Sequence, residues 1–288
     1  MHGLGVPLVT PFTKDGDVDH DRLRELVDWL ERSGVDFLVP CGSTSEAALL
    51  TAMERRAIFE TVCTAASVPV LAGTGHPGFR ETRETTAAAA DAGVDAALVV
   101  TPFYYDHGQE GLATYYRTLA DESSLPIYLY SVPKFTDVTL EPDTVETLAD
   151  HPNVVGMKDS SGALEAFLRT ANRVEDESFD LLVGSGSMLA QALDAGAAGG
   201  ILALANLAPA ATAEIVESHR NGDTSRAREQ NEALVELNAA ITGAYGIPGL
   251  KWAMRERGVS AGYPRSPHRE PDESAKAHLD ALLADISL

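Results

Sequence analysis

Cysteine and lysine are scarce in this chain of 288 residues, which has two cysteines, Cys41 and Cys63, and five lysines. Two cysteines cannot form a disulfide framework, and no Cys-x-x-Cys spacing of a metal site occurs. We interpret both cysteines as small apolar side chains of the core. Because lysine is rare, any chemistry that needs a lysine amine has only five candidates.

Basic residues and long apolar segments are also few. The 22 Lys and Arg residues stand against 43 Asp and Glu, and the resulting net charge of −21 argues against nucleic acid and anionic membranes as partners. No run of about 18 apolar residues is present to span a membrane, and residues 1–5 lack the features of a secretory signal. We therefore expect a cytoplasmic protein. The dispersed acidic charge resembles that of halophilic proteins, in which high salt screens self-repulsion.

Short apolar runs recur eight times, each followed by a turn rich in Gly, Ser, Thr or Pro and then by a helical pattern. The runs do not alternate with polar residues, as expected for strands buried on both faces of a parallel sheet. Eight even strand–helix units favour a closed (β/α)8 TIM barrel over a doubly wound open sheet, and no Gly-x-Gly-x-x-Gly follows the first run. The runs are residues 5–9, 37–39, 70–72, 97–100, 127–130, 154–157, 181–183 and 200–204.

Helical signals divide the chain into two parts of a single structural unit. Residues 1–221 are predicted to form the barrel, and residues 222–288 a C-terminal helical segment packed on it. A capping box over residues 51–54 opens a helix that runs to about Ala65, and residues 19–33 carry one apolar helical stripe. In the C-terminal segment we expect helices at residues 225–242, 249–257 and 273–286.

Lys158 directly follows one of the apolar runs. In a barrel, catalytic groups lie on the loops after the carboxyl ends of the strands. We expect the Lys158 amine to point into the barrel mouth, where burial lowers the pKa of an ammonium group. A neutral amine can attack a ketone and form an imine, which accepts the electrons of a neighbouring carbon–carbon bond. The structural alternative is an ion pair with Asp159 or another carboxylate.

Polar groups occur at two other strand ends. Tyr130 ends the run before that of Lys158, and a phenol there can move protons to and from the reacting carbon. Ser43 and Thr44 follow the second run, and Gly42 keeps the backbone accessible, so that hydroxyls and N–H groups make a carboxylate-binding turn. A packed aromatic and a plain turn are the alternatives for each feature alone. Their predicted position at one end of the barrel favours a shared site.

Four motifs over about residues 4–267 resemble the dihydrodipicolinate synthase / N-acetylneuraminate lyase superfamily. The resemblance implies a Schiff-base lyase that needs no metal or cofactor, because pyruvate is held as a covalent imine. It implies Lys158 as the imine-forming lysine and Tyr130 as the proton relay, with Ser43 and Thr44 on the pyruvate carboxylate. The motifs are Gly42-Ser43-Thr44-x-Glu46, Thr101-Pro102-x-Tyr104, Tyr130-x-Val132-Pro133 and Gly156-x-Lys158-Asp159.

The resemblance also implies an oligomer and further site residues. Members of the superfamily are often homotetramers built as dimers of dimers, and Tyr104 resembles a tyrosine that reaches across the tight dimer to complete the proton relay. Ile201 resembles a residue that lines the pyruvate pocket. We expect Gly42 and Gly184, which follows the seventh run, to contact substrate as well.

Phe135 departs from the pattern of the lysine-biosynthesis branch. That branch usually has an arginine two positions after the proline of Tyr-x-Val-Pro, where it binds the carboxylate of the aldehyde substrate. Phenylalanine cannot make this bidentate contact, and Lys134 would have to turn inward to replace it. The departure resembles archaeal-type 2-keto-3-deoxy-(phospho)gluconate aldolases. We therefore expect cleavage of 2-keto-3-deoxygluconate, or its 6-phosphate, to pyruvate and glyceraldehyde or its 3-phosphate.

A phosphate on such a substrate would require basic groups at the barrel mouth. His107 in the loop after the fourth run is a candidate, as are three arginines of the C-terminal segment. None of them forms a phosphate-binding motif. The three arginines are Arg255, Arg257 and Arg265.

Four alternative functions stay open. A dihydrodipicolinate synthase of lysine biosynthesis and a sugar-acid dehydratase would both use Lys158. A metal-dependent aldolase would need clustered ligands, but the eight histidines are scattered and only His76 and His107 fall in strand-end loops. A non-catalytic keto-acid binding protein on an inherited barrel is the last alternative.

Overall fold

Eight parallel strands lie side by side in the order β2-β1-β8-β7-β6-β5-β4-β3 in the computed structural model, which describes residues 1–175 and 178–284. A parallel bridge between Leu38 and Val70 joins the two ends of this sheet, so the barrel is nearly closed. The strands are β1 (Gly3–Pro7), β2 (Phe37–Val39), β3 (Leu71–Gly73), β4 (Ala96–Val100), β5 (Ile127–Ser131), β6 (Val154–Asp159), β7 (Asp180–Val183) and β8 (Gly199–Ile201).

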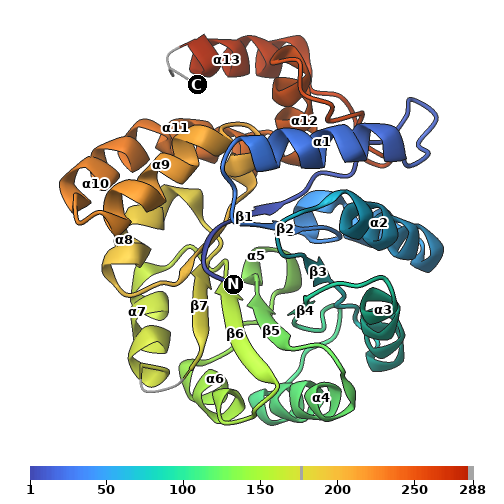
Figure 1. Cartoon of the computed structure of the whole chain (residues 1–288), viewed down its shortest axis with the longest axis vertical. Helices are drawn as coiled ribbons and strands as arrows, with labels where there is room; N and C mark the ends of the chain where they lie inside the picture. The colour runs from blue at the N-terminus through green and yellow to red at the C-terminus, as the bar shows by residue number, and fades with distance from the viewer. Residues whose placement is uncertain (176–177, 285–288) are drawn as a thin grey trace.

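Helices surround the strands and confirm the predicted (β/α)8 TIM barrel (Figure 1). The predicted capping box is present, because Thr51 and Glu54 exchange hydrogen bonds at the start of α2. No helix in the described part of the chain is long and apolar enough to cross a membrane. The helices that follow the eight strands in turn are α1 (His20–Arg32), α2 (Ala52–Ala65), α3 (Phe79–Asp91), α4 (Gln109–Glu122), α6 (Pro142–Ala149), α7 (Leu164–Arg173), α8 (Leu189–Asp194) and α9 (Pro209–Arg220).

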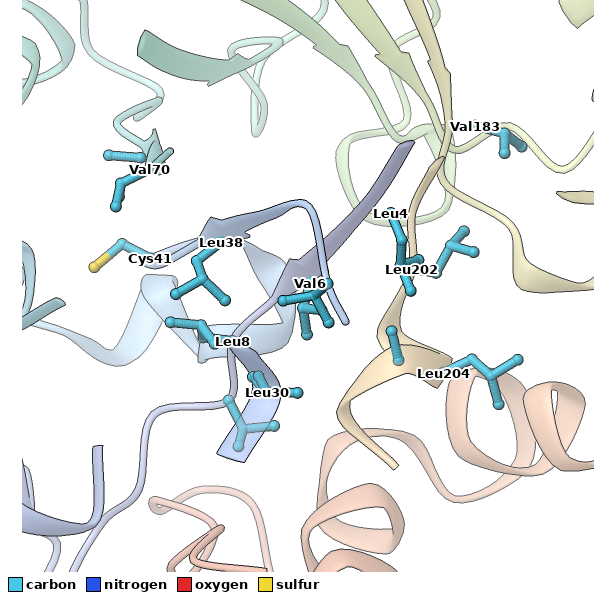
Figure 2. Close-up of a cluster of buried hydrophobic side chains, with 14 of the residues drawn as sticks. Leu4, Val6, Leu8, Leu30, Leu38, Cys41, Val70, Val183, Leu202 and Leu204 are labelled. Atoms are coloured by element: carbon cyan, nitrogen blue, oxygen red, sulfur yellow. The ribbon is translucent and has the colours of Figure 1, made fainter. Parts of the chain in front are cut away.

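Apolar side chains fill two separate layers because successive residues of a strand point to opposite faces. In β2, Phe37 and Val39 face the barrel interior, whereas Leu38 belongs to the layer between strands and helices. Figure 2 shows part of this outer layer, where Leu4 and Val6 of β1 belong to the same cluster as Leu30 of α1. Burial on both faces explains why the strands read as unbroken apolar runs.

Four more helices follow the barrel, and α12 and α13 pack against each other at one edge of the molecule (Figure 1). α10 packs on α8 and α9, and later residues of the C-terminal segment, Lys251 and Arg265, form ion pairs with Glu46 and Glu54 of the barrel. The four helices are α10 (Thr224–Ala233), α11 (Val235–Ala239), α12 (Gly246–Glu256) and α13 (Glu273–Ala284).

The predicted run 5–9 is displaced by two residues from β1, the predicted helix 249–257 begins three residues earlier as α12, and two further elements are cut short by irregular turns. The run 200–204 is a strand only to Ile201, after which a 3-10 turn, Ala203–Asn206, begins. The predicted helix 225–242 is divided into α10, α11 and a π-helical turn, Ala240–Ala244. Buried apolar residues continue into both breaks, Leu204 and Ala205 in the first and Ala240 and Ile241 in the second. The predicted helix 273–286 begins at Glu273 as expected, but its end lies outside the described residues.

Candidate active site

Lys158 and Tyr130 lie side by side at the carboxyl end of the barrel. They are register partners on β6 and β5, and Tyr130 is in turn the partner of Val100 on β4. Lys158 Nζ lies 4.5 Å from the centre of the Tyr130 ring. Both side chains are buried, with relative exposures of 6% and 4%. The strand register therefore brings the amine and the phenol together, as the sequence predicts.

Asp159 does not neutralise Lys158. The two residues are neighbours on β6 and therefore point to opposite faces of the strand. Asp159 instead accepts a hydrogen bond from the backbone N–H of Ser161 at 2.7 Å, and burial raises the pKa of its carboxyl. Within residues 1–175 and 178–284, Lys158 makes no ion pair. The ion pair considered as an alternative is therefore absent from the described structure.

The turn after β2 reaches the same site. Ser43–Ser45 forms a short 3-10 helix, and Ser43 Oγ lies 3.5 Å from the Tyr130 hydroxyl. Cys41 and Glu46, on either side of this turn, both have positive φ angles, 57° and 58°. Non-glycine residues rarely adopt this left-handed conformation, and such strain is concentrated at functional sites. Burial also raises the pKa of the Cys41 thiol to about 12, in keeping with an inert side chain.

A cavity of about 490 Å³ opens beside these groups. Gly42, Ser43 and Tyr130 line it, together with Phe135 from the short helix α5 (Pro133–Thr136). The Phe135 side chain is 60% exposed. Lys134 does not take the place of the missing arginine, because its Nζ donates to the backbone carbonyl of Thr242 at 2.7 Å.

Gly184 and Ile201 adjoin the buried pair from the next two strands. A Cβ atom on Gly184 would lie 1.8 Å from Ser160 Oγ and 3.0 Å from Lys158 Cε, so only glycine leaves room for the lysine side chain. Ile201 is completely buried and belongs to the same interior cluster as Tyr130. Both residues therefore lie next to the catalytic candidates.

Several predicted residues do not line this cavity. Lys158, Gly184 and Ile201 lie behind its wall, where Lys158 contacts the ring of Tyr130. Thr44 follows Ser43 in the turn but does not line the cavity, and neither do Tyr104 and His107. Tyr104 is 85% exposed and packs edge-on against Tyr105, with ring centres 5.0 Å apart. His107 lies on the exposed loop before α4.

The arginines suggested for a phosphate are engaged elsewhere. Arg255 pairs with Glu270, Arg257 donates to the carbonyl of Leu207, and Arg265 pairs with Glu54. None of the three lines the cavity. His76 does line it, but its Nδ1 accepts a hydrogen bond from the backbone N–H of Gly78. Among the described residues, no group of three His, Cys, Asp or Glu side chains is arranged to hold a metal ion.

Two charged residues near the site, Arg55 and Lys251, were missed by sequence reasoning, and Glu46 was named in a motif but given no role. Arg55 lines the cavity and is 94% buried; its Nη2 donates to the carbonyl of Ala47, and its Nη1 has no hydrogen-bond partner among the described residues. Glu46 and Lys251 form an ion pair in which neither side chain is exposed. A charge on a helix usually indicates a solvated face, so no local signal distinguishes Arg55 and Lys251.

A barrel with a buried lysine and tyrosine at its carboxyl end has an amine and a phenol of the kind that imine chemistry uses. The model of the dihydrodipicolinate synthetase family matches residues 1–286, and the chain belongs to this family. Family chemistry depends on pyruvate and a Schiff base, and the chain is accordingly an enzyme, a lyase.

Curated relatives and solved structures agree with this assignment. A 4-hydroxy-tetrahydrodipicolinate synthase of Methanothrix thermoacetophila is 38% identical over 100% of this chain and 97% of the relative. The protein of the same name from Haloarcula marismortui is 37% identical over 99% of this chain and 94% of the relative. The dihydrodipicolinate synthase of Acinetobacter baumannii, solved with pyruvate, is 33% identical with a TM-score of 0.94, covering 99% of this chain and 98% of that one.

These relatives correct the expected substrate. The expectation of a 2-keto-3-deoxy sugar-acid aldolase is wrong, because similarity to proteins named as synthases extends over the full length of the chain. That expectation depended on Phe135 alone. One exposed residue that lines the cavity is weaker evidence than sequence identity along the whole barrel. Without a sugar-acid substrate, nothing supports a role in carbohydrate metabolism.

Proposed function

We propose that the chain is a 4-hydroxy-tetrahydrodipicolinate synthase that uses Lys158 to bind pyruvate as an imine. The observation that carries the proposal is the buried contact between Lys158 and Tyr130, in a chain related over its full length to proteins of that name. The product's seven carbons and one nitrogen, less the three carbons of pyruvate, leave a four-carbon amino-acid aldehyde. Aspartate semialdehyde is the second substrate with this composition.

The proposed reaction begins at Lys158. Its amine attacks the ketone of pyruvate, and loss of one water gives the imine. Removal of a methyl proton then gives an enamine, whose carbon attacks the aldehyde carbon of the second substrate. The amino group of the added unit attacks the imine carbon, closes the ring and releases the Lys158 amine. Two substrates thus give one cyclic product and one water.

Tyr130, Ser43 and Thr44 are proposed to serve these steps. Tyr130 contacts the lysine through its ring and Ser43 through its hydroxyl, which suits a group that moves protons during imine formation and aldehyde addition. The hydroxyls and backbone N–H groups of Ser43 and Thr44 would hold the pyruvate carboxylate. Gly42, Gly184 and Ile201 would shape the pocket around it.

An oligomer is part of the proposal. Tyr104 and Tyr105 expose 85% and 69% of their surfaces, and Tyr104 has a positive φ of 83°. Large exposed aromatic side chains favour burial at a protein interface. We propose a homotetramer made of two tight dimers, with Tyr104 reaching the partner's site. A monomer by light scattering at high salt would contradict this assembly.

Borohydride trapping tests the central claim. The pure protein would be incubated with pyruvate and borohydride at high salt and then mapped by peptide mass. A reduced adduct on Lys158 is expected. Parallel assays should show consumption of pyruvate only when aspartate semialdehyde is present. A folded protein without the adduct would contradict the imine mechanism, and an adduct without turnover of this aldehyde would contradict the proposed second substrate.

A further inference from the structure

Glu46 ends the turn that carries Ser43 and Thr44. Its backbone N–H donates to the Ser43 carbonyl at 3.1 Å, and its φ of 58° lies in the left-handed region. L-residues seldom adopt this conformation unless their surroundings enforce it. The contacts of the Glu46 side chain therefore bear directly on the shape of the turn.

The Glu46 carboxylate is held by three donors from the C-terminal segment. Lys251 Nζ pairs with Oε1, while the Arg265 backbone N–H and His268 Nδ1 contact Oε2 at 3.0 and 2.9 Å. The carboxylate is completely buried, and a buried charge requires such partners. A segment more than 200 residues away in the sequence thus fixes the end of the turn.

Lys251 connects this carboxylate to the rest of the barrel mouth. Its ammonium group also donates to the carbonyls of Thr10 and Tyr263, at 2.7 and 2.9 Å, so that all three of its hydrogens are used. The Thr10 hydroxyl in turn donates to the Ser45 carbonyl at 2.7 Å. The ammonium group therefore holds the turn from two sides.

We propose that Glu46 and Lys251 are positioning residues for the pyruvate site. Their buried ion pair fixes the orientation of Ser43 and Thr44, and with it the hydroxyls and N–H groups that take the pyruvate carboxylate. Neither charged group needs to touch the substrate. The inference rests on the proposed function, because it assumes that pyruvate binds at this turn.

The inference is tested by measuring borohydride labelling of Lys158 as a function of pyruvate concentration, in variants of the full-length protein. Glu46→Gln and Lys251→Met should each raise the pyruvate concentration for half-maximal labelling at least tenfold, while saturating pyruvate still labels Lys158. Glu270→Gln is the matched control, because it removes the partner of Arg255 in the same segment without contacting the turn. Its half-maximal concentration should equal that of the wild type.

The double variant Glu46→Gln/Lys251→Met separates positioning from folding. Removing one partner leaves an unpaired buried charge, whereas removing both does not, so the double variant should recover most of the melting temperature lost by the single variants. It should nevertheless keep the raised half-maximal pyruvate concentration. If the double variant binds pyruvate as tightly as the wild type, the inference is wrong but the proposed function stands. A wild-type protein that takes no label would overturn the proposed function and the inference with it.

Discussion

Lys158 and Tyr130 are register partners on adjacent strands, and the lysine Nζ lies 4.5 Å from the centre of the tyrosine ring. A cation over the face of an aromatic ring is attracted by the ring itself. The ring of Tyr130 therefore helps to place the amine, whereas its hydroxyl is the group that could transfer protons. Removing the hydroxyl alone distinguishes the two contributions.

Tyr130→Phe should lower turnover by about 10²- to 10⁴-fold, the usual effect of losing a general acid–base group. Borohydride should still trap pyruvate on Lys158, because the ring remains beside the amine. Steady-state assays and peptide mapping measure the two effects. Tyr115→Phe, which removes a hydroxyl that donates to Thr82 away from the cavity, is the control and should leave turnover unchanged. Unchanged turnover in Tyr130→Phe would exclude the proton-relay role.

Gly184→Ala should impair imine formation. The new methyl group would collide with the Ser160 side chain and press on Lys158 Cε, so Ser160 must move and the lysine is pushed from its position. We expect at least a tenfold slower rate of trapping by pyruvate and borohydride. Gly111→Ala is the matched control, since a Cβ atom there meets nothing within 4 Å. A normal trapping rate in Gly184→Ala would show that the lysine does not depend on this space.

The barrel and its central pair could be predicted from the sequence because they depend on local patterns. Unbroken apolar runs indicate parallel strands, and the carboxyl ends of such strands meet at one end of a barrel. A polar residue at the carboxyl end of an apolar run is therefore predicted to lie at the site. Lys158 and Tyr130 were assigned to the site in this way. Gly184 was found in the same way.

The rest depends on contacts between distant segments. Lys251 meets Glu46 across 205 residues, and nothing local to either residue indicates its partner. The break between α10 and α11 was missed because Leu234 at the break and Leu237 in α11 are both buried and continue the apolar pattern. The substrate prediction failed because it relied on Phe135, a single exposed position.

Phe135→Arg should strengthen binding of the aldehyde substrate. A guanidinium at this position of the cavity wall could make a bidentate contact with a carboxylate. A charged hydrogen bond contributes about 1.5 kcal/mol or more, so the KM for aspartate semialdehyde should fall about tenfold while that for pyruvate stays the same. Phe135→Leu, which removes the ring without adding charge, is the control. An unchanged KM for the aldehyde would mean that its carboxylate binds elsewhere.

Glu54→Gln should remove a pH-dependent part of the stability. Hydrogen bonds from the Arg265 guanidinium lower the pKa of Glu54 from 4.5 to about 2. A carboxyl whose pKa is lowered by folding stabilises the protein fully above pH 4.5, and this contribution is lost as the pH falls toward 2. Because solvent reaches the pair, we expect a contribution of about 1 kcal/mol.

Urea unfolding of wild type and Glu54→Gln between pH 2 and pH 7, at constant salt, measures this contribution. The difference in unfolding free energy should be largest above pH 4.5 and should fall to a small fraction of that value by pH 2, where about half of the wild-type carboxyl is protonated. Glu273→Gln, on the exposed first turn of α13, is the control and should show no such dependence. The loss of a charge interaction must depend on pH, because the wild-type carboxyl is protonated as the pH falls. A difference that stays constant with pH would therefore assign the effect to altered geometry of the α2 capping box.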